Sequence, residues 1–131
     1  MRLGSEHAPA QAPRVIALDD SRTVLATVRA AFERLGCEVI TAEDPSELAP
    51  GDFHCASLIV VDVQMVHMYG DDIVQFLREQ WQVRAPIYLY SSLPQQELDR
   101  RAAAAGANGA VCKAEGVDAL VARVKHLAVV A

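Results

Sequence analysis

Four short apolar runs in this chain each end in residues with reactive side chains. The runs, with the residues that follow them, are Val15 to Leu18 with Asp19 and Asp20, Leu58 to Val61 with Asp62, Ile87 to Tyr90 with Ser91 and Ser92, and Ala110 to Cys112 with Lys113. If the runs are parallel strands separated by helices, their carboxyl ends share one edge of a sheet. Carboxylates, a hydroxyl and an ammonium from distant parts of the sequence would then meet in one crevice.

Helical patterns alternate with the apolar runs. The expected strands are Val15 to Leu18, Glu38 to Thr41, Leu58 to Val61, the run after Pro86, and Gly109 to Cys112. One expected helix starts near Arg22, with Ser21 as N-cap and Gly36 as stop. The others run from Asp71 to Gln80, from Pro94 to Ala105, and over the apolar positions from Val117 to Leu127. A further short helix is expected to open at Pro45 and to end at Pro50 and Gly51. The pattern predicts a doubly wound α/β sandwich of five strands and five helices.

Composition indicates a single domain. With 131 residues, 52% of them hydrophobic, the chain can build one core but has no room for a second domain of ordinary size. We expect residues 1–13 to be a disordered tail and residues 14–131 to be the domain.

Charge and cysteine usage limit the functional classes. A net charge of -5 with dispersed basic residues argues against direct nucleic-acid binding. No apolar stretch approaches the roughly 20 residues needed to span a membrane. Three cysteines without metal-ligand spacing are typical of reduced thiols, which favours a cytoplasmic location.

The predicted cluster suits magnesium and phosphoryl chemistry. Asp19, Asp20 and Asp62 offer the hard oxygen ligands that Mg²⁺ prefers, and crowded carboxylates call for a cation. An oxygen of Asp62 could attack phosphorus to form an acyl phosphate. Lys113 would neutralise charge on the phosphoryl group and Ser91 would donate a hydrogen bond to it. Lysine occurs only at positions 113 and 125, against ten arginines, which singles out Lys113.

Each of these residues also has an ordinary structural interpretation. An Asp pair after a strand often caps a helix, Ser91 and Ser92 before a proline suit a turn, and an isolated lysine is usually solvated. The joint placement at four strand ends favours the functional interpretation.

Four motifs resemble those of the receiver domain of two-component response regulators. They are VIALDDS with Asp19 and Asp20, LIVVDVQM with Asp62 followed by Gly70, YLYSS with Ser91, and AAAAGANGAVCK with Lys113. The resemblance covers residues 14 to 130. It implies a flavodoxin-like fold with strand order 2-1-3-4-5.

The resemblance also implies residue roles. Asp62 would be the phosphoacceptor, Asp20 a direct Mg²⁺ ligand and Asp19 an acid acting through water. The backbone carbonyl of Gln64 would complete the protein's share of the metal shell, and Ser91 would be the switch hydroxyl. The implied phosphodonor is a histidine kinase or a histidine phosphotransfer protein. A downstream protein would bind the face formed by the helix from Pro94, the strand from Gly109 and the last helix.

Three positions depart from the family pattern. Val66 and Ala114 stand where prolines are usual, and Ala110 replaces an aromatic switch residue. We therefore expect a trans Lys113–Ala114 bond, because a non-proline cis bond costs about 3 kcal/mol. Tyr88 and Tyr90 should lie on one side of their strand as core residues, and His67 should be a solvated loop residue.

Two functions remain open from the sequence. The favoured one is a phosphorylation-dependent switch that catalyses its own phosphoryl transfer and dephosphorylation without turning over a separate substrate. The alternative is a degenerate receiver that acts as a constitutive interaction module, as Ala110 and Ala114 suggest. A haloacid dehalogenase type of hydrolase would need an Asp-x-Asp pair, which Asp19 and Asp20 do not provide.

Overall fold

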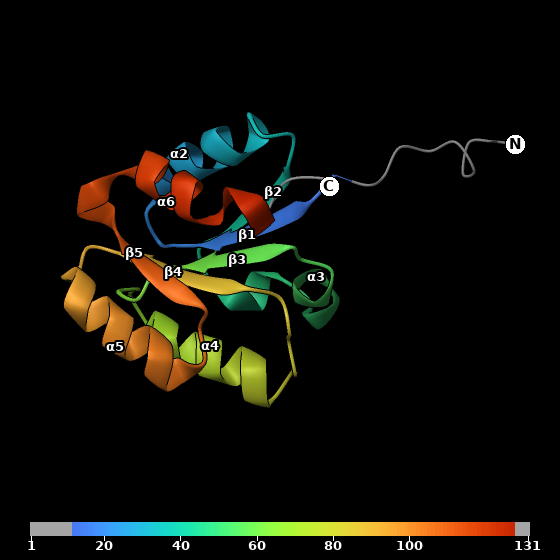
Figure 1. The fold of residues 1–131 in the computed structure, drawn as a ribbon. Coiled ribbons are helices and arrows are strands. Elements are labelled where there is room, and N and C mark those ends of the chain that lie inside the picture. Colours follow the sequence, from blue (N-terminus) through green and yellow to red (C-terminus); the bar gives the residue numbers. More distant parts are fainter. Residues whose placement is uncertain (1–11, 128–131) are drawn as a thin grey trace, which may run out of the picture.

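The computed structural model describes residues 12–127, which form a parallel sheet with helices on both faces (Figure 1). The five strands follow the order β2-β1-β3-β4-β5. Their bounds are Arg14–Leu18 for β1, Glu38–Ala42 for β2, Leu58–Val61 for β3, Ile87–Ser91 for β4 and Gly109–Cys112 for β5. The predicted doubly wound architecture and strand order are confirmed. Residues 1–11 of the expected tail lie outside the described range.

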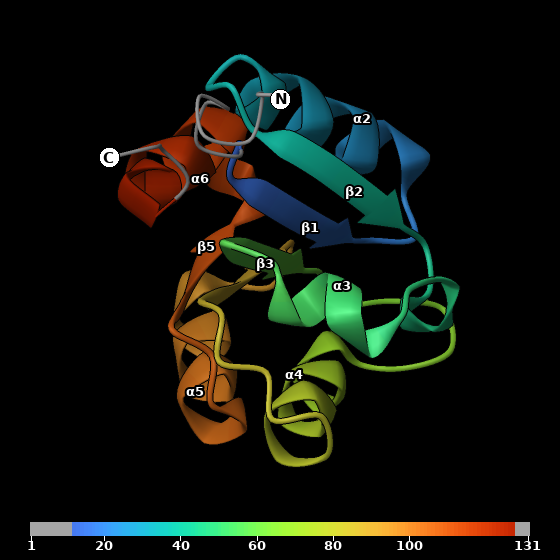
Figure 2. The ribbon, with the colours of Figure 1, turned by 90° about the vertical axis from the view of Figure 1, so that its right-hand side faces the viewer.

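Five α-helices lie within the described range, four of them between strands and the last after β5. Their bounds are Arg22–Glu33 for α2, Pro50–His54 for α3, Gly70–Glu79 for α4, Gln95–Ala105 for α5 and Val117–Val124 for α6. Helices α2 and α6 cover one face of the sheet, and α3, α4 and α5 cover the other (Figures 1 and 2). Between residues 12 and 127, no helix combines the length and apolar character required to cross a membrane.

Both faces of the sheet are buried, as expected for parallel strands enclosed by helices. Ile16, Ile59 and Leu89 belong to the core on the α4 and α5 side. Tyr88 and Tyr90 belong to the core on the α2 and α6 side. The two tyrosines therefore occupy the same face as core residues, which agrees with the strand period of two.

The predicted N-cap at Ser21 is confirmed, and α5 ends at a glycine. The Ser21 hydroxyl accepts a hydrogen bond of 3.3 Å from the backbone N–H of Val24 and caps α2. Gly106 ends α5 with φ of 91°, a left-handed conformation that glycine adopts without a steric cost. The last helix is shorter than expected, because α6 ends at Val124 and continues as a 3-10 turn over Lys125–Leu127.

The connection between β2 and β3 differs from the expectation. A 3-10 turn, η1, covers Pro45–Glu47, and Pro50 then begins α3 instead of ending a helix. Proline fits the first helical turn because its missing N–H would have no partner there. The Asp52 carboxylate also accepts a hydrogen bond of 2.9 Å from the Ala49 N–H, which favours a helix start. The connection thus holds two very short helical segments.

Arg78, near the end of α4, hydrogen-bonds to the end of α5 and to the segments before β4 and β5. Its guanidinium donates hydrogen bonds of 2.7 to 2.9 Å to the carbonyls of Val83, Ala85 and Gly106 and to the side-chain oxygen of Asn108. The same Asn108 oxygen accepts a bond of 2.9 Å from the N–H of Ile87. These contacts join α4 to the end of α5 and to the segments that lead into β4 and β5.

Candidate phosphoacceptor site

The register of β1 and β3 brings two carboxylates together. Leu18 pairs with Val61, and the N–H of Asp62 donates a hydrogen bond of 2.9 Å to the carbonyl of Leu18. Asp19 and Asp62, the residues that follow the two strands, therefore lie at the same edge of the sheet. Both are buried, with 4% of their surface exposed.

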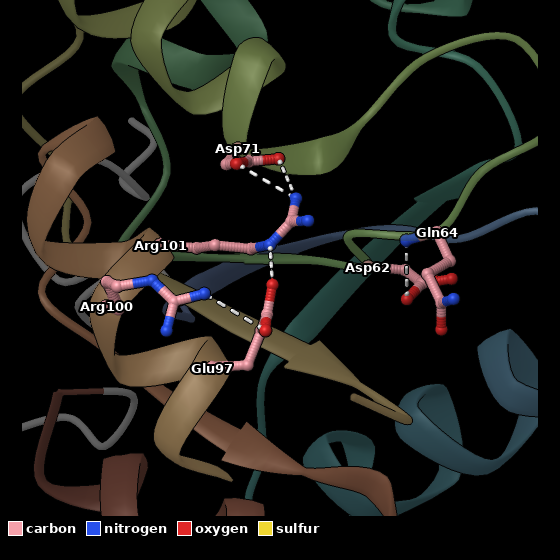
Figure 3. Close-up of polar contacts among 6 residues, drawn as sticks. All are labelled: Asp62, Gln64, Asp71, Glu97, Arg100 and Arg101. Atoms are coloured by element: carbon pink, nitrogen blue, oxygen red, sulfur yellow. Dashed lines mark hydrogen bonds and ion pairs between the residues drawn. The ribbon is translucent and has the colours of Figure 1, made fainter. Parts of the chain in front are cut away.

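Asp20 joins these two residues to form an acidic cluster. Asp19, Asp20 and Asp62 each offer a carboxylate oxygen within 4.8 Å of the others. An oxygen of Asp19 accepts a hydrogen bond of 2.9 Å from the N–H of Ser21. The N–H of Gln64 donates a bond of 3.2 Å to Asp62 (Figure 3). Burial raises the pKa of Asp19, and the hydrogen bond from Lys113 opposes this effect.

Lys113 projects from the end of β5 into the acidic cluster. Its Nζ lies 2.8 Å from Asp19 Oδ2 and 3.5 Å from Asp62 Oδ2. The Tyr90 ring centroid lies 6.0 Å from the same Nζ, at the outer limit of a cation–π contact. Lys113 is therefore not a solvated surface charge, and two of the three carboxylates have an ionic partner.

The cluster fits a divalent cation. Three carboxylates and one ammonium leave a formal excess of two negative charges at the site. Hard oxygen donors at this spacing match the preference of Mg²⁺, which uses few protein carboxylates and retains several waters. Asp19, Asp20 and Asp62 could hold such an ion.

Ser91 is the last residue of β4 and has an unusual environment. Its side chain is fully buried, and within the described residues its hydroxyl has no hydrogen-bond partner. An unpaired buried hydroxyl is destabilising, so such groups are often retained for function. The neighbouring Ser92 is exposed.

Gln95 hydrogen-bonds to the backbone of β5 at Ala110, the position where the sequence lacks an aromatic residue. Ala110 is fully buried, and its carbonyl accepts a hydrogen bond of 2.8 Å from the Gln95 amide. Gln95 also accepts a bond of 2.9 Å from the N–H of Cys112. The sequence pattern gave no signal for this contact. The described residues contain no cis peptide bond, so the Lys113–Ala114 bond is trans as expected.

The sequence pattern also did not predict a charged network beside the site. Arg101 on α5 lies 3.2 Å from Asp71 at the start of α4 and 3.0 Å from Glu97 (Figure 3). Its guanidinium also stacks 5.6 Å from the Tyr69 ring centroid. The spacing of Glu97 and Arg101 by one helical turn could have indicated their pairing, but the contact with Asp71 depends on how α4 and α5 pack.

Gly70 allows the start of α4 to approach the backbone of Asp62. A Cβ added to Gly70 would overlap the carbonyl oxygen of Asp62. The Gly70 N–H donates a bond of 2.8 Å to the carbonyl of Val63. Only glycine fits this position, because any side chain would collide with the backbone that carries Asp62.

A sequence profile of the response regulator receiver domain family matches residues 15–125. The chain belongs to this family. A gliding motility regulatory protein of Myxococcus xanthus is 34% identical over 117 residues, which are 87% of this chain and 15% of that protein. The receiver domain thus spans a small part of this relative.

Two solved receiver structures have the same fold. The chemotaxis protein CheY4 of Vibrio cholerae has 28% identity and a TM-score of 0.78, over 89% of this chain and 99% of that chain. The receiver domain of the Francisella response regulator 1452 has 26% identity and a TM-score of 0.76, over 88% and 95%. Phosphorylation-dependent switching in two-component signalling is the general function of this family, and its members typically bind Mg²⁺ at an Asp cluster.

Proposed function

We propose that this receiver domain is a phosphorylation switch in which Asp62 accepts a phosphoryl group from a histidine kinase or a histidine phosphotransfer protein. The position of Lys113 carries this proposal, because its ammonium lies between Asp19 and Asp62. A degenerate site would have no need to bury two carboxylates beside this lysine.

The reaction is an exchange of bonds at phosphorus. An oxygen of Asp62 forms the new O–P bond while the N–P bond of the donor phosphohistidine breaks, and the imidazole keeps the electron pair. The N–H of Gln64 orients one Asp62 oxygen, and Lys113 faces the other. Lys113 then balances the charge of the phosphoryl group, and the free hydroxyl of Ser91 donates a hydrogen bond to it.

Asp19, Asp20 and Asp62, with the backbone carbonyl of Gln64, are the proposed Mg²⁺ ligands. Asp20 would bind directly and Asp19 through water. When bound, Mg²⁺ neutralises the negative charge of the incoming phosphoryl group. Asp20 has no ion pair within residues 12–127, so its carboxylate is available for this role.

The output surface is the face formed by α5, β5 and α6, where a downstream protein would bind. Ser91 precedes α5 and Lys113 follows β5, so both lie next to this face. Since Ala110 offers no ring to rotate, the change would be a shift of loop and helix. We place phosphoryl transfer in the cytoplasm because the three cysteines show no metal-ligand spacing and are odd in number, which is typical of reduced thiols.

Intact-mass spectrometry tests the acceptor. Treatment with acetyl phosphate and Mg²⁺ should add the mass of one phosphoryl group, and Asp62→Asn should remove this gain. Asp20→Asn should reduce the Mg²⁺ dependence more strongly than Asp19→Asn, because it removes a direct ligand. A phosphoryl adduct that persists in Asp62→Asn would reject the assignment.

The alternative, a constitutive interaction module, is favoured by the absence of an aromatic side chain at Ala110. Beryllofluoride with Mg²⁺, followed by amide chemical-shift mapping, separates the two functions. A switch predicts shifts in α5 and α6, whereas shifts confined to the loops around Asp20 and Asp62 would support the interaction module.

A further inference from the structure

The segment from Val66 to Phe76 carries an unusual concentration of exposed apolar side chains. Within residues 12–127, the large hydrophobic side chains with high exposure are Val66, Met68, Tyr69 and Phe76. Single exposed apolar residues are common, but Met68 and Phe76 line the same groove, and apolar side chains gathered in this way indicate an interaction surface. This group follows the proposed acceptor and continues into α4.

An apolar groove lies between η1 and α4. It encloses about 430 Å³, and its lining includes Met68, Ile73, Phe76 and Trp81. The short β2–β3 connection explains the groove, because α3 has only five residues and leaves this side of α4 uncovered. A groove of this size can accept several apolar side chains of a ligand.

Trp81 forms one wall of the groove. Its ring centroid lies 5.8 Å from the centroid of the Phe53 ring and 5.1 Å from that of the Phe76 ring. Phe53 is fully buried. Preformed aromatic surfaces are typical of the central contacts in protein interfaces, because little side-chain entropy is lost on binding.

The groove has an acidic border. Asp44 and Asp72 line it, and Glu47 lies in η1 beside it. None of the three forms a salt bridge within the described part of the chain. A hydrogen bond from the Ser46 N–H lowers the pKa of Asp44, and the nearby His67 adds to this effect. The border therefore offers carboxylates to a ligand.

We propose that this groove, lined by Met68, Ile73, Phe76 and Trp81, binds an amphipathic helix of a partner protein that carries basic residues beside its apolar anchors. Apolar residues one helical turn apart would enter the groove, and lysine or arginine residues would face Asp44 and Asp72. A second copy of the chain fits less well, because a two-fold contact would bring the same carboxylates together. This surface lies outside the face formed by α5, β5 and α6.

A designed peptide provides a direct test. The probe is a helix of about fourteen residues, made of leucine on one face and lysine on the other, with a counterpart in which glutamate replaces lysine. The chain contains one tryptophan, so the emission of Trp81 reports occupancy of the groove. The lysine peptide should change this emission in a saturable manner, and the glutamate peptide should not. Equal responses to both peptides would overturn the proposal.

Variants of the groove sharpen the test. Phe76→Ala should weaken binding of the lysine peptide by about tenfold or more. Asp44→Asn combined with Asp72→Asn should weaken it by about threefold and reduce its salt dependence. Val66→Ala is the matched control, because Val66 is 74% exposed but does not line the groove. It should leave the affinity within about twofold.

Three further results would overturn the proposal. They are unchanged affinity in Phe76→Ala, peptide-induced amide shifts located on α5 and α6 instead of α4, and Trp81 emission that changes with protein concentration alone, which would indicate self-association. Phe76 is 45% exposed, so its replacement should preserve the fold, and a thermal melt checks this. The experiment involves no phosphoryl group, so its failure would leave the proposed switch untouched.

Discussion

The side-chain amide of Gln95 donates a hydrogen bond of 2.8 Å to the backbone carbonyl of Ala110. Together with the bond from Cys112, this contact pairs the outer edge of β5 as a further strand would. Gln95 begins α5, and Cys112 precedes Lys113. One side chain thus links the helix after Ser91 to the strand before Lys113.

Gln95→Ala should lower the free energy of unfolding by about 1 to 2 kcal/mol, because it leaves two backbone groups of β5 without partners. Urea unfolding measures the change. Gln96→Ala is the matched control, since Gln96 is exposed and should change stability by less than about 0.5 kcal/mol. Equal stability of the two variants would show that water replaces the Gln95 amide without cost.

Ser91→Ala should separate stability from function. The Ser91 hydroxyl is buried without a partner, so its removal should leave the free energy of unfolding unchanged or raise it by up to about 1 kcal/mol. The same variant should slow phosphorylation by acetyl phosphate by about tenfold or more, because a donor to the phosphoryl oxygen is lost. Ser92→Ala should change neither quantity. A clear loss of stability in Ser91→Ala would contradict the observed environment.

Asp19→Asn should stabilise the metal-free protein at neutral pH. Burial raises the pKa of Asp19, so its ionised form is less favourable in the folded chain than in the unfolded chain. This cost is fully present above the folded pKa and disappears as the pH falls through that value towards the ordinary value of 3.8.

The advantage of Asp19→Asn should therefore shrink as the pH is lowered from 7 towards 4, as measured by urea unfolding in the presence of a chelator. Lys113 keeps Asp62 as a partner in this variant. Glu115→Gln, at an exposed position, should differ little from the parent at any pH. An advantage that grows on acidification would contradict the raised pKa.

Gly70→Ala and Gly51→Ala should have opposite effects. A Cβ at Gly70 collides with the backbone of Asp62, so the substitution should cost about 3 kcal/mol or more. Gly51 lies in α3 with open space around the added Cβ, so alanine there should add about 0.5 kcal/mol. Thermal melts of both variants measure the difference, and similar melting temperatures would refute the close approach at Gly70.

The sequence predicted the sheet and the convergence at its edge because both depend on local patterns. Each strand is a short apolar run, and parallel order places Asp19, Asp62 and Lys113 at one edge. Even the trans bond at Ala114 followed from the residue type. Patterns of residues that lie close together in the sequence were sufficient to predict these features.

Other features depend on contacts that no local pattern encodes. Pro50 suits both the end of one helix and the start of another, and the carboxylate of Asp52 decides between them. Gln95 meets β5, and Arg101 meets Asp71, only because of how α5 packs on its neighbours. The groove beside Trp81 exists because a short connection leaves α4 uncovered, which is a property of the assembled fold.

The contacts of Arg78 restrict how α4 and α5 can move relative to each other. Its bonds fix the end of α4 to the end of α5 and to the segments entering β4 and β5, at the sheet edge opposite the acidic cluster. Sliding of α4 along α5 would break these bonds together. Arg78 therefore couples the two helices at the ends that lie away from Asp62, while the contacts of Gly70 hold the start of α4 against the backbone around Asp62.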